Sequence, residues 1–191
     1  MVTKSETVRG RTKAAIIDTA VNMLAARGDA ASMDEIAKSA GIARATLYRY
    51  FPNREQLLSA LAAATVDELA LRIEEAQLDA VPFEEGVARL SRAIIATGSK
   101  FVALNADSVT YRTTHPDFDS RVTAPMRAFF ARGIAHGELR GDLPADVLLD
   151  LFSGLIKGAL GATARGHRGI EETAAAVTSV FLHGARVPPR S

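Results

Sequence analysis

Apolar residues recur at every third or fourth position through most of this chain, and this spacing constrains the fold more than any other feature of the sequence. It is the period at which side chains return to one face of an α-helix. Runs of β-branched residues are short, and glycine and proline divide the pattern into about nine helical segments. The sequence therefore predicts an all-α protein.

Local signals indicate where several of these helices begin or end. Ser32 and Glu35 form an S-x-x-E capping box that opens a short second helix. Asn53 is a suitable N-cap for a long fourth helix, within which we place the boundary between two domains. Gly98 is expected to end the fifth helix and open a sixth, and Pro125 to kink the seventh.

Composition excludes several classes of protein. The 191 residues include no cysteine, so the chain has no disulfide and no thiolate metal site. We find no signal peptide and no membrane-spanning segment, and expect a cytoplasmic protein that binds no membrane. The nucleotide-binding and serine-hydrolase motifs are absent, so neither enzymatic activity nor a cofactor is expected. His115, Asp117 and Asp119 could form a metal corner, although helix capping explains the aspartates better.

Residues 32–51 have the spacing of a helix-turn-helix. Two short helices that cross steeply need a small residue at their contact, which Ala37 supplies, and a turn residue that tolerates positive φ, which Gly41 supplies. Leu47 would face back from the second helix onto the first. This packing leaves the outer face of the second helix free.

The outer face of this second helix carries side chains that suit DNA. Arginine can pair with guanine edges or phosphates, threonine can donate to either, and a tyrosine hydroxyl can reach phosphate oxygens. Residues 1–60 contain nine basic and six acidic side chains, a net charge of +3 against +1 for the whole chain. The DNA-facing candidates of the second helix are Arg44, Ala45, Thr46, Tyr48, Arg49 and Tyr50.

Further phosphate contacts are expected around this helix. Arg54 opens the fourth helix, and Arg9, Arg11 and Lys13 form a basic arm. The amide groups of the helix that begins after Ser32 could receive another phosphate. The spacing alone leaves a second interpretation open, in which the tyrosines are core aromatics and the arginines a solvated surface.

The strings MDEIAKSAGIA and TLYRYFPNREQLLSAL resemble the DNA-binding region of TetR-type regulators, over about residues 11–60. The resemblance implies that residues 9–60 form the DNA-binding domain, with the helix-turn-helix at about 32–51. Ala43 departs from the pattern because it replaces the usual serine cap of the recognition helix, and Ala45 because it stands where glycine is common. By the resemblance, DNA contacts fall on Ser32, Arg44, Ala45, Thr46, Tyr48, Arg49, Tyr50 and Arg54.

The same resemblance implies that residues 61–187 form a helical bundle for dimerisation and ligand binding. The eighth and ninth helices carry an apolar stripe wider than one core face needs, so we expect them to pair with their symmetry mates in a homodimer. In the alternative interpretation the stripe is the core of one subunit. The expected interface residues are Leu148, Phe152, Leu155, Ile156, Ala159, Val177 and Phe181.

A small hydrophobic or amphipathic effector is expected in the bundle, although packing roles would explain the same residues. The pocket candidates are Phe101, Asn105, Tyr111, Met126, Phe129 and Phe130. The sequence therefore predicts a DNA-binding transcriptional regulator, a ligand-responsive repressor that binds a palindromic operator as a homodimer. A protein with the same DNA-binding domain but no small-molecule switch, constitutive or controlled by a protein partner, is the alternative.

Overall fold

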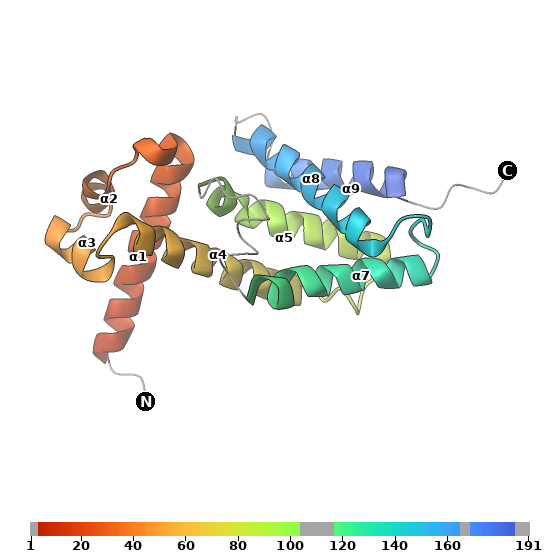
Figure 1. Cartoon of the computed structure of the whole chain (residues 1–191), viewed down its shortest axis with the longest axis horizontal. Coiled ribbons are helices and arrows are strands. Elements are labelled where there is room, and N and C mark those ends of the chain that lie inside the picture. Colours follow the sequence, from red (N-terminus) through yellow and green to blue (C-terminus); the bar gives the residue numbers. More distant parts are fainter. Residues whose placement is uncertain (1–3, 104–116, 165–168, 186–191) are drawn as a thin grey trace. The chain divides into compact units, whose positions relative to one another are not determined.

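The computed structural model describes residues 4–103, 117–164 and 169–185, and every regular element in these ranges is helical (Figure 1). The all-α prediction is confirmed, and the described residues form eight α-helices, close to the expected nine. Their bounds are α1 Lys4–Arg27, α2 Met33–Ser39, α3 Arg44–Tyr50, α4 Arg54–Glu75, α5 Phe83–Ala103, α7 Ala124–Ala135, α8 Ala145–Ala164 and α9 Ile170–Ala185. A 3-10 turn, Gly28–Ala30, follows α1, and a π turn, Asp119–Thr123, precedes α7.

The chain forms two compact units. Unit 1 comprises the described residues up to Thr65 together with 99–103, and unit 2 comprises 66–98, 117–164 and 169–185. The division after Thr65 falls inside α4. Each unit has its own hydrophobic core.

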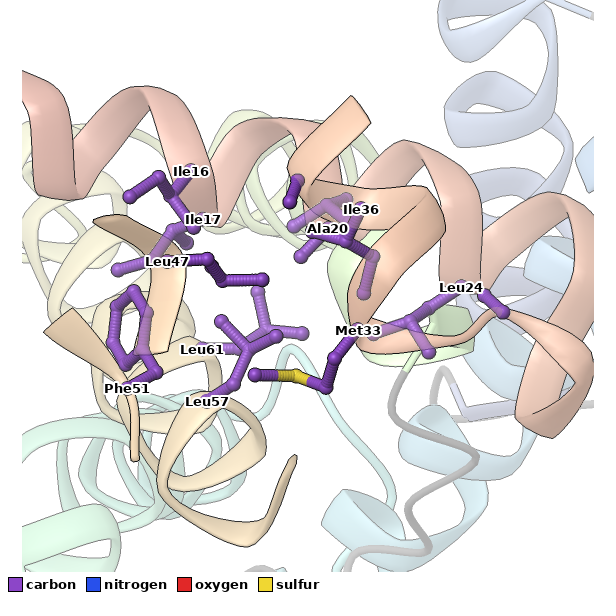
Figure 2. Close-up of a cluster of buried hydrophobic side chains, with 13 residues drawn as sticks. Ile16, Ile17, Ala20, Leu24, Met33, Ile36, Leu47, Phe51, Leu57 and Leu61 are labelled. Carbon is purple, nitrogen blue, oxygen red and sulfur yellow. The ribbon is translucent and has the colours of Figure 1, made fainter. Parts of the chain in front are cut away.

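The core of unit 1 joins α1, α2, α3 and the first half of α4. Figure 2 shows side chains from these helices converging, among them Ile16, Leu47 and Leu61. All three are at most 1% exposed, and Ala37 and Ile36 of α2 are buried with them. This core fixes α3 with its apolar side inward, so that the opposite side faces outward.

Asn53 starts α4 as predicted. The backbone N–H of Gln56 donates to Asn53 Oδ1 at 2.8 Å, which satisfies one amide of the first turn. The cap holds the start of α4 next to the end of α3, so the two helices are joined by a short, defined turn.

Five phenylalanines dominate the core of unit 2. Phe130 contacts the rings of Phe152 and Phe181, with centroids 5.5 and 5.3 Å apart, and Phe129 stacks on Phe83 at 4.7 Å. The stacked pair lies against two glycines: a Cβ on Gly86 would be 2.6 Å from the Phe129 ring, and one on Gly133 would overlap Phe83. The rings therefore leave no room for a larger residue at Gly86 of α5 or at Gly133 of α7.

The prediction that Gly98 separates two helices is wrong. α5 continues through Gly98 to Ala103, because Gly98 lies where α5 packs closely against α8. A Cβ at Gly98 would overlap the side chain of Leu160. Close packing, rather than a chain break, explains this glycine.

An irregular turn precedes Pro125, which the sequence predicts to lie inside the seventh helix and to kink it. The residues before it, Asp119–Thr123, form a π turn in which the N–H of Ala124 donates to the carbonyl of Asp119. Pro125 has no N–H to continue the regular ladder, and the wider turn accommodates that gap at the start of α7.

Candidate nucleic-acid interface

The turn between α2 and α3 is a Schellman motif built around Gly41. Gly41 has a φ of +65°, in the left-handed region that glycine tolerates. The N–H of Ile42 donates to the carbonyl of Ala37 at 3.0 Å, and that of Gly41 to Lys38 at 3.2 Å. Together with the buried Ala37 and Leu47, these bonds confirm the helix-turn-helix geometry predicted from the spacing.

The predicted capping box at Ser32 and Glu35 is also present. Ser32 Oγ accepts from the N–H of Glu35 at 3.3 Å, and the N–H of Ser32 donates to Glu35 Oε2 at 2.9 Å. The Ser32 hydroxyl also donates to this carboxylate, whose other oxygen accepts from Arg27 at 2.7 Å. These bonds, the one from the Ser32 backbone foremost, lower the pKa of Glu35 from 4.5 to about 2. Ser32 thus sits at the start of α2 with both its N–H and its hydroxyl proton directed to Glu35.

The outward side of α3 presents the predicted residues. Arg44, Ala45 and Arg49 are exposed, while Thr46 is half-buried. Tyr48 and Tyr50 are half-buried and pack against the unit 1 core, so the core and surface interpretations of these tyrosines both hold in part.

Arginines and tyrosines interleave on this side. The guanidinium of Arg44 lies 5.4 Å from the centre of the Tyr48 ring, and those of Arg49 and Arg9 lie 5.8 and 5.9 Å from that of Tyr50. Cations over aromatic faces are attracted by the ring quadrupole, which orders long side chains at a surface.

The basic surface of α3 extends onto α1. Arg9 shares the Tyr50 ring with Arg49, and the Lys13 ammonium lies 6.0 Å from the centre of the Phe51 ring. Arg9 and Lys13 are one helical turn apart and both exposed. We call Arg9, Lys13 and Arg49 the basic strip.

Arg54 has a contact that the sequence does not reveal. Its Nη1 donates to the backbone carbonyl of Ala31, so the first residue of α4 is tied to the segment before α2. This bond gives Arg54 a structural role in the helix-turn-helix, in addition to its place next to the DNA-facing side of α3.

Two further residues shape α3. Ala43 stands at its N-cap with no side-chain hydrogen bond, as expected where alanine replaces serine. Asp34 of α2, which belongs to none of the motifs in the sequence, forms an ion pair with Arg44, with Oδ2 and Nη1 2.8 Å apart. The opposite charges of Asp34 and Arg44, on either side of the turn between α2 and α3, were the signal in the sequence that could have predicted this pair.

The sequence of this unit matches a known family. The family model described as bacterial regulatory proteins of the tetR family matches residues 16–61. HTH-type transcriptional regulator NfxB of Pseudomonas aeruginosa is 31% identical over 171 residues, which cover 84% of this chain and 88% of NfxB. The chain belongs to the TetR family of transcriptional regulators. It is therefore a DNA-binding regulator, and its relatives are regulators rather than enzymes.

Other members of the TetR family share sequence or fold with it. HTH-type transcriptional repressor LfrR of Mycolicibacterium smegmatis is 37% identical over 90 residues, 47% of each chain. A crystal structure of LfrR in complex with proflavine superposes with a TM-score of 0.75 at 23% identity, covering 93% of this chain and 97% of LfrR. A crystal structure of FadR of Bacillus subtilis in complex with stearoyl-CoA superposes with a TM-score of 0.71 at 20% identity, covering 89% of this chain and 97% of FadR. The two structures establish the fold alone.

The structure places the pocket candidates in different surroundings. Met126, Phe129 and Phe130 are at most 5% exposed and packed in the core of unit 2. Phe101 lies in α5, while Asn105 and Tyr111 fall outside the described residues. The three described side chains thus contribute to packing in this conformation, the second role considered for them.

The expected dimer residues divide between core and surface. Five are buried in the core of the subunit: Leu148, Phe152, Ile156, Val177 and Phe181. Two of these, Leu148 and Phe181, also border a surface groove between α8 and α9, and the interface role of the predicted residues stays a prediction. Leu155 and Ala159 are half-buried. Periodicity located the apolar stripe but not which part of it the subunit's own core uses.

Some other large apolar side chains of α8 and α9 are exposed. Leu151 and Val180 are 55% and 58% exposed, and they line a groove of about 690 Å³ with Leu155, Gly154 and Gly158. We call these five residues the α8–α9 face.

The proposed metal corner falls partly outside the described residues, since His115 is among those not described. Asp119 forms an ion pair with Arg127 at 3.6 Å, which gives this carboxylate a structural role. In the described ranges no group of three acidic or histidine side chains could hold a metal. Nor, in the same ranges, is any helix both long and apolar enough to cross a membrane.

Proposed function

We propose that this TetR-family protein is a repressor that binds a palindromic operator as a homodimer and leaves it when a small hydrophobic or amphipathic molecule binds unit 2. The observation that carries the DNA part is the outward side of α3, with its interleaved arginines and tyrosines beside the basic strip. We assign DNA binding to residues 9–60 and effector binding and dimerisation to 61–187.

The α8–α9 face supports the homodimer. One helix-turn-helix gives limited affinity, and two that enter successive major grooves provide both strength and palindrome recognition. Leu151 and Val180 would be the apolar anchors, and Gly154 and Gly158, exposed on α8, would let a partner helix approach closely. A twofold interface is self-complementary, so one such face is enough to form the dimer.

Leu151→Glu tests the dimer. Because Leu151 is 55% exposed, the charge should leave the subunit folded but should split the dimer, reducing the mass measured by light scattering to that of one chain. Leu71→Glu is the matched control, since Leu71 is a leucine of unit 2 on α4 that is 54% exposed. Wild-type protein with the mass of one chain at micromolar concentration would refute the dimer.

The effector is supported by the relatives whose structures contain proflavine or stearoyl-CoA. These two compounds, with other lipophilic molecules, form the first panel for thermal melting. A ligand at 100 times its dissociation constant stabilises the folded state by about 2.7 kcal/mol, which should raise Tm by roughly 5–10 °C for a chain of this size. The same ligand should release operator DNA.

One observation favours the alternative without a small-molecule switch. Met126, Phe129 and Phe130 are packed closely, and a ligand that used them would have to displace aromatic contacts. In that case no compound shifts Tm, and DNA binding responds only to a protein partner or to nothing. Melting and operator release with the same panel separate the two candidates.

A further inference from the structure

Arg44 is held by two neighbours at the first position of the recognition helix. Its guanidinium lies 5.4 Å from the centre of the Tyr48 ring, one turn along α3, and its Nη1 is 2.8 Å from Asp34 Oδ2 on α2. The side chain nevertheless remains 67% exposed. Arg44 is thus oriented without being covered.

Such an arrangement suits the recognition of a base edge. The first residues of a recognition helix are the ones that reach bases, and arginine pairs with guanine through two parallel hydrogen bonds. A guanidinium carries more N–H donors than one carboxylate can accept. Asp34 at Nη1 therefore leaves donors for a base while restricting the rotation of the group.

Holding the guanidinium in advance lowers the cost of binding. A free arginine loses side-chain freedom when it pairs with a base, and a preorganised one loses less. The orientation favours pairing with the correct base, because the two hydrogen bonds to that base depend on the angle of the planar guanidinium. Unselected DNA offers the same phosphates but not this base, so the gain appears in the ratio of operator affinity to affinity for unselected DNA.

We propose that Asp34 is a specificity-determining positioning residue, which orients the Arg44 guanidinium against the face of Tyr48 for pairing with a guanine in each operator half-site. The proposal rests on the base-contacting role given to Arg44. In the competing hypothesis, Asp34 acts only by repulsion, and its carboxylate weakens binding to every DNA because it repels phosphates.

The two roles predict opposite effects of Asp34→Asn. The operator for this test is the sequence that the wild-type protein selects from a random DNA pool. Without the positioning carboxylate, the affinity of the variant for this operator should fall relative to its affinity for unselected DNA. Exposed ion pairs of this kind give a loss of roughly two- to fivefold for each half-site. A repulsive Asp34 would instead give a variant that binds both DNAs more tightly and by the same factor, which would overturn the proposal.

Glu55→Gln is the matched control, because Glu55 is an exposed acid in the first turn of α4, a helix of the same unit. It removes the same charge without touching Arg44 and should leave the ratio of operator to unselected affinity unchanged. Melting curves of both variants check that unit 1 remains folded. An equal loss of ratio in both variants would contradict a specific role for Asp34.

A double-variant cycle separates this proposal from the one on which it rests. Arg44→Ala should relax base preference by itself, and Asp34→Asn should then have no further effect on the ratio. If Arg44→Ala leaves the base preference intact, the base-contacting role of Arg44 is wrong. If Arg44→Ala relaxes the preference but Asp34→Asn does not, only the positioning role is wrong.

Discussion

Replacing Arg9 and Lys13 with glutamine should make operator binding much less sensitive to salt. Both side chains are exposed on α1, and their charges lie against the rings of Tyr50 and Phe51 at the end of α3. The basic strip therefore continues the DNA-facing side of α3 onto another helix. If both residues contact phosphates, the double variant binds fewer phosphates and releases fewer counterions.

The expected size of this effect follows from counting charges. Two lost phosphate contacts in each subunit of a dimer make about four, and each contributes about 0.9 to the slope of log K against log salt, so the slope should flatten by roughly 3.6. Between 50 and 200 mM salt, wild-type affinity should fall by roughly 150 times more than that of the variant.

Fluorescence anisotropy with a labelled operator at four or more salt concentrations measures the slope. The sequence groups Arg11 with these two residues, but Arg11 lies two positions from each of them, on the other side of α1, so we now expect it to contact no phosphate. Because Arg11 is also exposed, Arg11→Gln is the matched control. A double variant with the wild-type slope, or with no greater change than Arg11→Gln, would refute the extension of the interface onto α1.

Three further changes test local features of the fold. Ala43→Ser should supply the missing cap of α3 and raise the free energy of unfolding by about 0.5–2 kcal/mol in urea titrations, and an unchanged midpoint would contradict the open cap. The pKa of Glu35 is lowered from 4.5 to about 2, so its contribution to stability is present above pH 4.5 and is lost as the pH falls toward 2. Glu35→Gln should therefore make the free energy of unfolding less dependent on pH in that window. An identical dependence in the variant and the wild type would count against the capping box. Gly86→Ala should lower Tm and reduce the free energy of unfolding by about 1–3 kcal/mol, because the new methyl group meets the Phe129 ring. Gly10→Ala, with open space around it, should instead raise the free energy of unfolding by about 0.5–1 kcal/mol. Equal effects of the two substitutions would refute the packing argument.

The features that the sequence predicts well depend on short stretches of chain. The capping box at Ser32, the left-handed turn at Gly41 and the N-cap at Asn53 each involve residues at most a few positions apart. Their hydrogen bonds form wherever the local backbone adopts the right dihedral angles, so the residue types are sufficient evidence. The sequence alone therefore locates the helix-turn-helix.

The features that it predicts poorly depend on contacts between distant residues. Gly98 has the local properties of a helix end, yet Leu160 on another helix explains why glycine is needed there. Similarly, periodicity identifies the apolar stripe of α8 but cannot tell that Phe152 faces the subunit core while Leu151 faces outward. The bond from Arg54 to Ala31 joins residues 23 positions apart and has no local signal.

Selection of DNA from a random pool by the wild-type protein and by Arg44→Ala tests the central claim most directly, that this protein reads a palindrome with the outward side of α3. We expect the wild type to enrich two inverted half-sites about 34–36 Å apart, or a multiple of a DNA turn. Arg44→Ala should lose the preference at one guanine in each half-site, at a cost of about 1–3 kcal/mol. A single half-site, or the same sequence with the same base preferences from both proteins, would contradict the account.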